Sequence, residues 1–239
     1  MGRLCISSML VAKLDVAPLM SGYLALFDMD GTLLDINTAA LYVRWRQRHG
    51  LSSNLDVLRV GIWLMQYKFG LLNAPRIAEK VMQQFRGDRE DELRLDCTRW
   101  YEQEVRSHIV EQGRLTVENH RSAGAVLALV TSATHYAADP LADDLGIPHV
   151  LCTELEVNES GCFTGQIIKP MCFGEGKAQR AMIWARSRGL DLEHAHFYTD
   201  SITDAPLLNI VAHPVAVNPD PRLKLLAQAN SWTTEYWQT

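Results

Sequence analysis

Four aspartates stand where two predicted strands end. Asp28 and Asp30 come directly after the apolar run at residues 23–27, and Asp200 and Asp204 follow a second run at residues 196–199. Because alternate positions along a strand point the same way, the first pair can face one site. Carboxylates gathered in a dry cleft repel one another, and a divalent cation that prefers oxygen ligands, Mg²⁺, relieves the repulsion. Each motif alone could be a turn or a helix cap, but their occurrence at two strand ends favours a magnesium site.

A lysine and two hydroxyl residues add the features that a phosphate dianion needs. Lys177 follows Gly-Glu-Gly at the start of a predicted helix, where the backbone favours anions and the ammonium adds a point charge. Thr131, with Ser132 beside it, ends the apolar run at residues 125–130. Each of these residues alone is typical of an ordinary surface or strand end. Combined with the four aspartates, they indicate a site for a phosphate ester.

Short apolar runs that end in polar residues predict the strands that must position these side chains. The runs cover residues 23–27, 125–130, 196–199 and 215–217, and continuous apolar runs are typical of buried parallel strands. Between them, Ala178, Ala181, Met182 and Ala185 fall on one helical face, and Gly189 follows as a stop. Alternating strands and helices predict an α/β fold, a Rossmann-like, doubly wound parallel sheet with helices on both faces. A small β-hairpin is expected at residues 153–168.

Residues 37–112, here called the insertion, have an all-helical pattern. Helices are expected at residues 38–49, along the apolar stripe of residues 55–69, from Pro75 to Gly87, and from residue 88 to a stop at Gly113. The insertion holds 12 Lys and Arg against 10 Asp and Glu, although the whole chain has a net charge of −5. We therefore expect residues 1–21 to be an N-terminal extension, residues 22–36 and 113–239 to form the core, and residues 37–112 to be a helical cap.

Composition excludes several classes of protein. The chain has 239 residues, 47% of them hydrophobic, which is enough to bury a core without crosslinks. The net charge of −5 argues against a nucleic-acid partner, and no apolar run has the length of a transmembrane segment. The five cysteines are dispersed and form no Cys-x-x-Cys pair, so neither a disulfide framework nor a zinc ribbon is expected. We expect a cytoplasmic protein with a small-molecule substrate.

Four ordered motifs resemble those of a known family. They are Asp28-Met-Asp-Gly-Thr-Leu-Leu, Leu-Val-Thr131, Gly-Glu-Gly-Lys177 and Tyr-Thr-Asp200-Ser-Ile-Thr-Asp204. In this order they are similar to the motifs of the haloacid dehalogenase (HAD) superfamily. The helical insertion directly after the first motif, and the hairpin that contains Phe163-Thr-Gly165, resemble the phosphoserine-phosphatase-like branch. The resemblance covers nearly all of residues 22–220.

The resemblance implies a Mg²⁺-dependent phosphatase that works through an aspartyl-phosphate. By analogy, Asp28 is the nucleophile and Asp30 is the general acid and base. Mg²⁺ would be held by the Asp28 carboxylate, the Asp30 backbone carbonyl and Asp200. The intact Asp-x-Asp pair disfavours dehalogenase chemistry, which needs no second aspartate as a proton donor. No lysine of the insertion lies in a motif for phosphonate hydrolysis.

The same resemblance gives the other polar residues supporting roles. Thr131, Ser132 and Lys177 would hold the transferring phosphoryl oxygens, and Asp204 would orient Lys177 or a metal-bound water. Two other functions use the same residues. One is a phosphotransferase that passes the phosphoryl group to an acceptor hydroxyl, and the other is a sensor that binds a phosphate ligand without turnover. The presence of a proton donor at Asp30 argues against the sensor.

We expect residues of the insertion to contact the leaving group of the substrate and to determine which ester is bound. Phosphoserine phosphatases have a glutamate seven positions after the second aspartate, and this sequence has the neutral Asn37 there, which argues against phosphoserine. Arg44, one helical turn from Arg48, could contact a second anionic group or be solvated. A small metabolite, phosphoserine-like or histidinol-phosphate-like, is the expected substrate. A lysophospholipid or phosphatidylglycerophosphate is the alternative, because the apolar residues 61–72 could touch a membrane surface or pack inside the cap.

Overall fold

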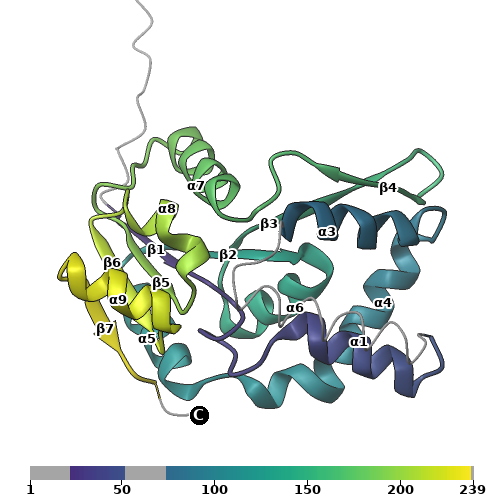
Figure 1. The fold of residues 1–239 in the computed structure, drawn as a ribbon, viewed down its shortest axis with the longest axis horizontal. Coiled ribbons are helices and arrows are strands. Elements are labelled where there is room, and N and C mark those ends of the chain that lie inside the picture. Colours follow the sequence, from purple (N-terminus) through teal and green to yellow (C-terminus); the bar gives the residue numbers. More distant parts are fainter. Residues whose placement is uncertain (1–21, 52–73, 238–239) are drawn as a thin grey trace, which may run out of the picture.

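The computed structural model describes residues 22–51 and 74–237, and a seven-stranded sheet forms its centre (Figure 1). The strand order is β4-β3-β2-β1-β5-β6-β7. All neighbouring strands are parallel except β3 and β4, which form an antiparallel hairpin. The strands are β1 (Leu24–Phe27), β2 (Val126–Thr134), β3 (His149–Val157), β4 (Phe163–Ile168), β5 (His196–Thr199), β6 (His213–Val217) and β7 (Thr233–Glu235). The predicted α/β sheet is confirmed.

Helices cover both faces of this sheet. Helices α5 (Glu111–Ser122) and α6 (His135–Leu145) lie on one face, and α7 (Glu175–Ser187), α8 (Ala205–Leu208) and α9 (Pro221–Ala229) lie on the other. The alternation of side chains along β1 separates the two layers. Phe27 belongs to the buried cluster that contains Val117 and Leu141, whereas Leu26 belongs to the cluster that contains Trp184. All four residues of β1 are buried, as expected for a central parallel strand.

Strand β2 is longer than the sequence predicts. Its apolar part ends at Val130, yet the strand continues to Thr134, which pairs with Thr153 of β3. The register between the two strands shifts between Val130 and Thr134. The prediction that this strand ends at Thr131 is wrong, because pairing with β3 keeps the polar residues extended as far as Thr134.

The described elements of the insertion are all helical. They are α1 (Thr38–Arg48), α3 (Ala74–Met82), η1 (Gln83–Phe85), α4 (Glu90–Trp100), the π-helical turn η2 (Tyr101–Val105) and η3 (Arg106–His108). Figure 1 shows α1, α3 and α4 grouped at one side of the sheet. The helix expected at residues 55–69 lies outside the described residues.

Gly113 does not end a helix, contrary to the sequence prediction. The break comes earlier, at Val110, whose extended backbone donates its N–H to the Leu33 carbonyl at 2.9 Å. Gly113 then lies inside α5, where a Cβ atom would be 3.1 Å from the side chains of both Leu33 and Trp237. The glycine permits close packing, and α5 starts before the predicted boundary of the core.

The β3–β4 hairpin is bonded to the insertion. Gly87 donates its N–H to the Phe163 carbonyl at 2.9 Å, and Phe163 donates in return to the Asp88 carbonyl at 3.0 Å. Glu90 donates its N–H to the Gly161 carbonyl, also at 3.0 Å. The hairpin, expected within the core segment, therefore joins the helices η1 and α4 through backbone hydrogen bonds.

Candidate active site

The two central strands deliver Asp28 and Asp200 to one edge of the sheet. The chain passes from β1 to β2 and β3 on one side, then returns to β5 on the other side of β1. Such a switch in direction opens a crevice at the carboxyl ends of the strands. Asp28 directly follows β1, and its N–H donates to the Tyr198 carbonyl of β5 at 2.9 Å. Asp28 is therefore level with Thr199, one residue before Asp200.

Lys177 joins two of the predicted aspartates. Its Nζ donates to Asp28 Oδ1 at 3.0 Å and to Asp204 Oδ2 at 2.7 Å, and all three residues are buried. The turn at Gly174, with a φ of 54°, starts α7 and places Lys177 in the first turn of this helix. Burial alone lowers the pKa of Lys177, but Asp204 and Asp28 outweigh it and hold the pKa above its ordinary value. The site therefore contains a buried ammonium.

Thr199 completes this network, although the sequence analysis did not select it. Its hydroxyl donates to Asp204 Oδ2 at 2.7 Å and lies 3.4 Å from Asp28 Oδ2. The residue is fully buried. Its position directly before Asp200, at the end of a strand that neighbours β1, is the signal that could have identified it.

Asp30 has two carboxylate oxygens in different surroundings. Oδ2 accepts hydrogen bonds from Thr38, from the backbone N–H at 3.2 Å and from the side-chain hydroxyl at 3.0 Å. Oδ1 is buried and has no hydrogen-bond partner among the described residues. Burial raises the pKa of Asp30 to about 7, and Asp28 adds to this effect while Thr38 opposes it. Asp30 can therefore both give and take a proton near neutral pH.

Asp200 lies against the backbone of the first motif. A Cβ atom on Gly31 would be 2.3 Å from Asp200 Oδ2, and Gly31 has a φ of 70°, so this position requires glycine. Burial, followed by the charges of Asp28, Asp204 and Asp30, raises the pKa of Asp200 to about 8. The other three aspartates are thus close enough to Asp200 to repel its carboxylate.

Thr131 and Ser132 lie beside this cluster in β2. Phe27 pairs with Leu129, so Thr131 is one step beyond the level of Asp28 in the adjacent strand. Its buried hydroxyl accepts the Ala133 N–H at 3.1 Å, which leaves the hydroxyl proton available to another acceptor. Ser132, by contrast, is exposed.

Of the two predicted substrate residues, Asn37 directly precedes α1 and Arg44 lies within it. The Asn37 side-chain oxygen accepts the Ala40 N–H at 3.0 Å and caps this helix. Arg44 is exposed, and its neighbour Arg48 forms an ion pair with Glu104. Within the described part of the chain, neither Asn37 nor Arg44 forms a hydrogen bond with the aspartates. Their role toward a substrate stays a prediction.

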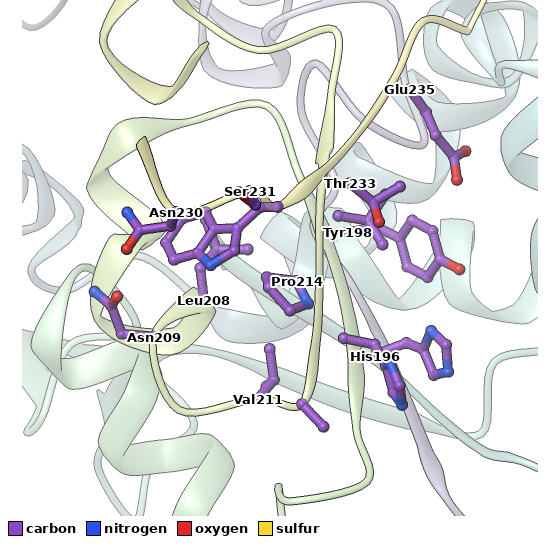
Figure 2. A pocket seen from close by; sticks show the side chains of 14 residues that line it. His196, Tyr198, Leu208, Asn209, Val211, Pro214, Asn230, Ser231, Thr233 and Glu235 are labelled. Carbon is purple, nitrogen blue, oxygen red and sulfur yellow. The ribbon is translucent and has the colours of Figure 1, made fainter. Parts of the chain in front are cut away.

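A pocket of about 650 Å³ lies at the other end of the sheet (Figure 2). His196 and His213 line it at the starts of β5 and β6, with ring centroids 4.3 Å apart. None of the four aspartates lines this pocket. In residues 22–51 and 74–237, no group of three or more His, Cys, Asp or Glu forms a metal cluster. The ring of His196 packs against those of His120 and His213, and His135 is the first residue of α6.

Comparison with known proteins decides the family. The model of the family described as haloacid dehalogenase-like hydrolase matches residues 25–209. The chain belongs to this family. A histidinol-phosphatase of Neisseria meningitidis serogroup C (strain 8013) is 28% identical over 213 residues, covering 87% of this chain and 96% of that protein. Phosphoserine phosphatase SerB1 of Mycobacterium tuberculosis (strain ATCC 25618 / H37Rv) is 31% identical over 214 residues, covering 87% and 68%.

Solved structures of the haloacid dehalogenase-like fold agree. A Bordetella pertussis Tohama I protein of unknown function has a TM-score of 0.81 and 32% identity, covering 90% of this chain and 98% of that one. A phospho-aspartyl intermediate analogue of phosphoserine phosphatase has a TM-score of 0.67, covers 91% and 94%, and shares the fold at 19% identity. The membership that the four motifs predict, in the phosphoserine-phosphatase-like branch, is confirmed. The chain is a HAD-type phosphatase.

Proposed function

We propose that the protein hydrolyses a small phosphomonoester through an aspartyl-phosphate on Asp28. The observation that carries this proposal is the buried contact of 3.0 Å between Lys177 Nζ and Asp28 Oδ1. An ammonium at this distance offsets the charge that a phosphate dianion brings to a carboxylate. The contact lies at the carboxyl end of β1, the edge at which α/β sheets bind ligands. Positioning and charge stabilisation are most of what phosphoryl transfer requires.

The proposed reaction has two displacements at phosphorus. An oxygen of Asp28 forms a bond to phosphorus, the ester P–O bond breaks, and the leaving oxygen takes a proton from Asp30. Water then attacks the phosphoryl group and gives its proton to the Asp30 carboxylate. The bond between Asp28 and phosphorus breaks, inorganic phosphate leaves, and both aspartates return to their starting states.

The donor set fits Mg²⁺. Asp28 and Asp200 would hold the ion through carboxylate oxygens, and Asp30 through its backbone carbonyl. Burial, with added repulsion from the other three aspartates, raises the pKa of Asp200 to about 8, and a bound cation would relieve that repulsion. Three protein oxygens leave room for water and phosphate ligands, which Mg²⁺ commonly keeps. When bound, the ion neutralises charge between the anionic nucleophile and the anionic substrate.

Three polar residues would hold the phosphoryl oxygens. Lys177 supplies the ammonium, and Thr131 supplies a buried hydroxyl at the adjacent strand. Ser132 follows at the exposed side of the same strand. Asp204 would keep Lys177 in place through their contact of 2.7 Å. Because Thr199 donates to the same oxygen of Asp204, the lysine is held by a partner that is itself fixed.

We favour a histidinol-phosphate-like substrate over phosphoserine. Where phosphoserine phosphatases have a glutamate, this chain has Asn37, and the side-chain oxygen of Asn37 is used to cap α1. The histidinol-phosphatase relative matches this chain over 96% of its own length. Residues 61–72, on which the lysophospholipid alternative depends, lie outside the described residues. No helix in the described ranges has the length and apolar character to cross a membrane.

A panel of phosphomonoesters tests the proposal. Phosphate release would be measured with Mg²⁺ for histidinol phosphate, phosphoserine, glycerol phosphate, sugar phosphates, lysophosphatidate and an aryl phosphate, with Asp28→Asn as the blank. We expect release above the blank, greatest for histidinol phosphate. Release that is greatest for lysophosphatidate would overturn the small-metabolite assignment. Phosphoryl groups recovered on an added alcohol in place of water would identify a phosphotransferase, and binding without turnover would identify a sensor.

A further inference from the structure

We infer that Thr38 is a positioning residue for Asp30, so that the first helix of the insertion aims the proton-transferring carboxyl of the core. This inference rests on the proposed function of Asp30. Thr38 is the first residue of α1, and both its backbone N–H and its hydroxyl donate to Asp30 Oδ2. The two distances are 3.2 and 3.0 Å. Two donors on one residue fix both the place and the rotation of the carboxyl group.

Helix capping does not explain this arrangement. The side chain that caps α1 is that of Asn37, which accepts the Ala40 N–H at 3.0 Å. The Thr38 hydroxyl instead points out of the helix, to a carboxylate eight residues earlier in the chain. Thr38 is 3% exposed, so water does not compete for this bond. A threonine that served the helix alone would not need to reach Asp30.

The double contact makes the two oxygens of Asp30 unequal. Oδ2 has its acceptor positions occupied by Thr38, whereas Oδ1 is buried with no partner in the described part of the chain. A buried polar atom left without a partner is costly unless a ligand satisfies it. Oδ1 is therefore the atom that faces the leaving group and the attacking water. Thr38 acts through Asp30 and does not itself touch the substrate.

Two esters with different leaving groups separate positioning from general stability. An alkyl phosphate needs a proton on its leaving oxygen, whereas an aryl phosphate with an acidic phenol does not. The variants are Thr38→Val, which removes the hydroxyl at nearly constant volume, and Thr38→Ser, which keeps it. Thr38→Ala is made as well, because alanine favours the helix and secures a folded variant without the hydroxyl. Thr98→Val is the matched control, since the Thr98 hydroxyl of α4 donates to the Arg94 carbonyl of its own helix and has no other hydrogen bond within residues 22–51 and 74–237.

The readout is kcat/KM, which covers the steps up to release of the alcohol. We expect Thr38→Val and Thr38→Ala to lower kcat/KM for the alkyl ester by about 10- to 100-fold and for the aryl ester by less than about threefold. Thr38→Ser and Thr98→Val should stay close to the wild type on both esters. Equal falls on the two esters, or a Ser variant as poor as the Val variant, would overturn this inference and leave the proposed function standing. A wild type that hydrolyses neither ester would overturn the proposed function and this inference with it.

Discussion

The Nζ of Lys177 lies 3.0 Å from Oδ1 of Asp28, although 149 positions separate the two residues in the chain. The contact brings the first turn of α7 to the end of the central strand β1. Both side chains are almost completely inaccessible to water. A second hydrogen bond, from Lys177 Nζ to Asp204 at 2.7 Å, means that the lysine connects the aspartate that follows β1 with one that follows β5.

Removing the Lys177 ammonium should destabilise the fold as well as the activity. Lys177→Met leaves Asp28 and Asp204 buried without their cation, so we expect the free energy of unfolding to fall by about 3–5 kcal/mol. Urea denaturation of the metal-free protein measures this change. The exposed Lys224→Met is the control and should change the free energy by less than about 0.5 kcal/mol.

A double variant tests the electrostatic reason for that loss. Asp204→Asn removes one of the uncompensated charges, so the pair Lys177→Met with Asp204→Asn should lose less stability than the sum of the single changes. Additive losses would mean that Lys177 acts through packing alone.

Gly31→Ala should harm the site through a direct collision. The new Cβ atom would lie 2.3 Å from Asp200 Oδ2, and a φ of 70° adds backbone strain. We expect activity to fall by at least about tenfold, because Asp200 must move. Gly87→Ala is the matched control, since Gly87 has a φ of 90° and no atom within 4 Å of the added Cβ. It should lose similar stability yet keep its activity, and equal inactivation of both variants would contradict the contact with Asp200.

Much of this arrangement was predictable from sequence because the motifs coincide with strand ends. A parallel sheet gathers the residues that follow its strands at one edge, so Asp28, Asp200 and Thr131 could be placed together without a structure. Lys177 could be placed because a Gly-rich turn precedes a helical pattern.

Other features depend on contacts between distant segments. A glycine after a helical pattern is typical of a helix end, yet Gly113 lies inside a helix and allows close packing against Leu33 and Trp237. In the sequence, Thr38 is indistinguishable from any other threonine at the start of a helix, and its contact with Asp30 depends on the three-dimensional path of α1. The bonds between the β3–β4 hairpin and the insertion have no local sequence signal, since backbone atoms form them.

Removal of divalent metal should stop the reaction. EDTA should abolish phosphate release and added Mg²⁺ should restore it. Asp200→Asn removes one of the proposed carboxylate ligands, so half-maximal activity should require at least about tenfold more Mg²⁺. Activity that persists in EDTA would remove the metal from the account, and an unchanged Mg²⁺ requirement would remove Asp200 from the ligand set.

The histidines at the far end of the sheet should make stability depend on pH. Burial, together with the charges of His120 and His213, lowers the pKa of His196 to about 4. Burial also lowers the pKa of His120, and Glu235 partly opposes that shift. Because the folded-state pKa of His196 lies below the ordinary value of about 6.5, the unfolded chain binds a proton first as the pH falls. The contribution of neutral His196 to the free energy of unfolding is therefore present above about pH 6.5 and is lost as the pH falls toward 4. Allowing for partial solvent screening, we expect His196→Gln to remove about 1–2 kcal/mol of the loss between pH 7 and 4.

The control for the pH dependence is His194→Gln, two positions away. His194 is exposed, so the slope of unfolding free energy against pH should match that of the wild type. Urea denaturation at several pH values measures both slopes. If His196→Gln and His194→Gln had the same slope, burial of His196 would not be the cause of the pH dependence of stability.

Trapping the phosphoryl group on the chain tests the central claim most directly. Asp30→Asn would be mixed with an aryl phosphate, which needs no proton donor to leave but whose aspartyl-phosphate needs a base to break down. The reaction would be quenched in acid, and the peptides would be analysed by mass spectrometry. The account predicts one phosphoryl group on the peptide that contains Asp28, and none when Asp28→Asn is added to the same protein. The account would be contradicted if the wild type released phosphate but the Asp30→Asn variant carried no phosphoryl group on Asp28. A phosphoryl group on another residue of the variant would also contradict it.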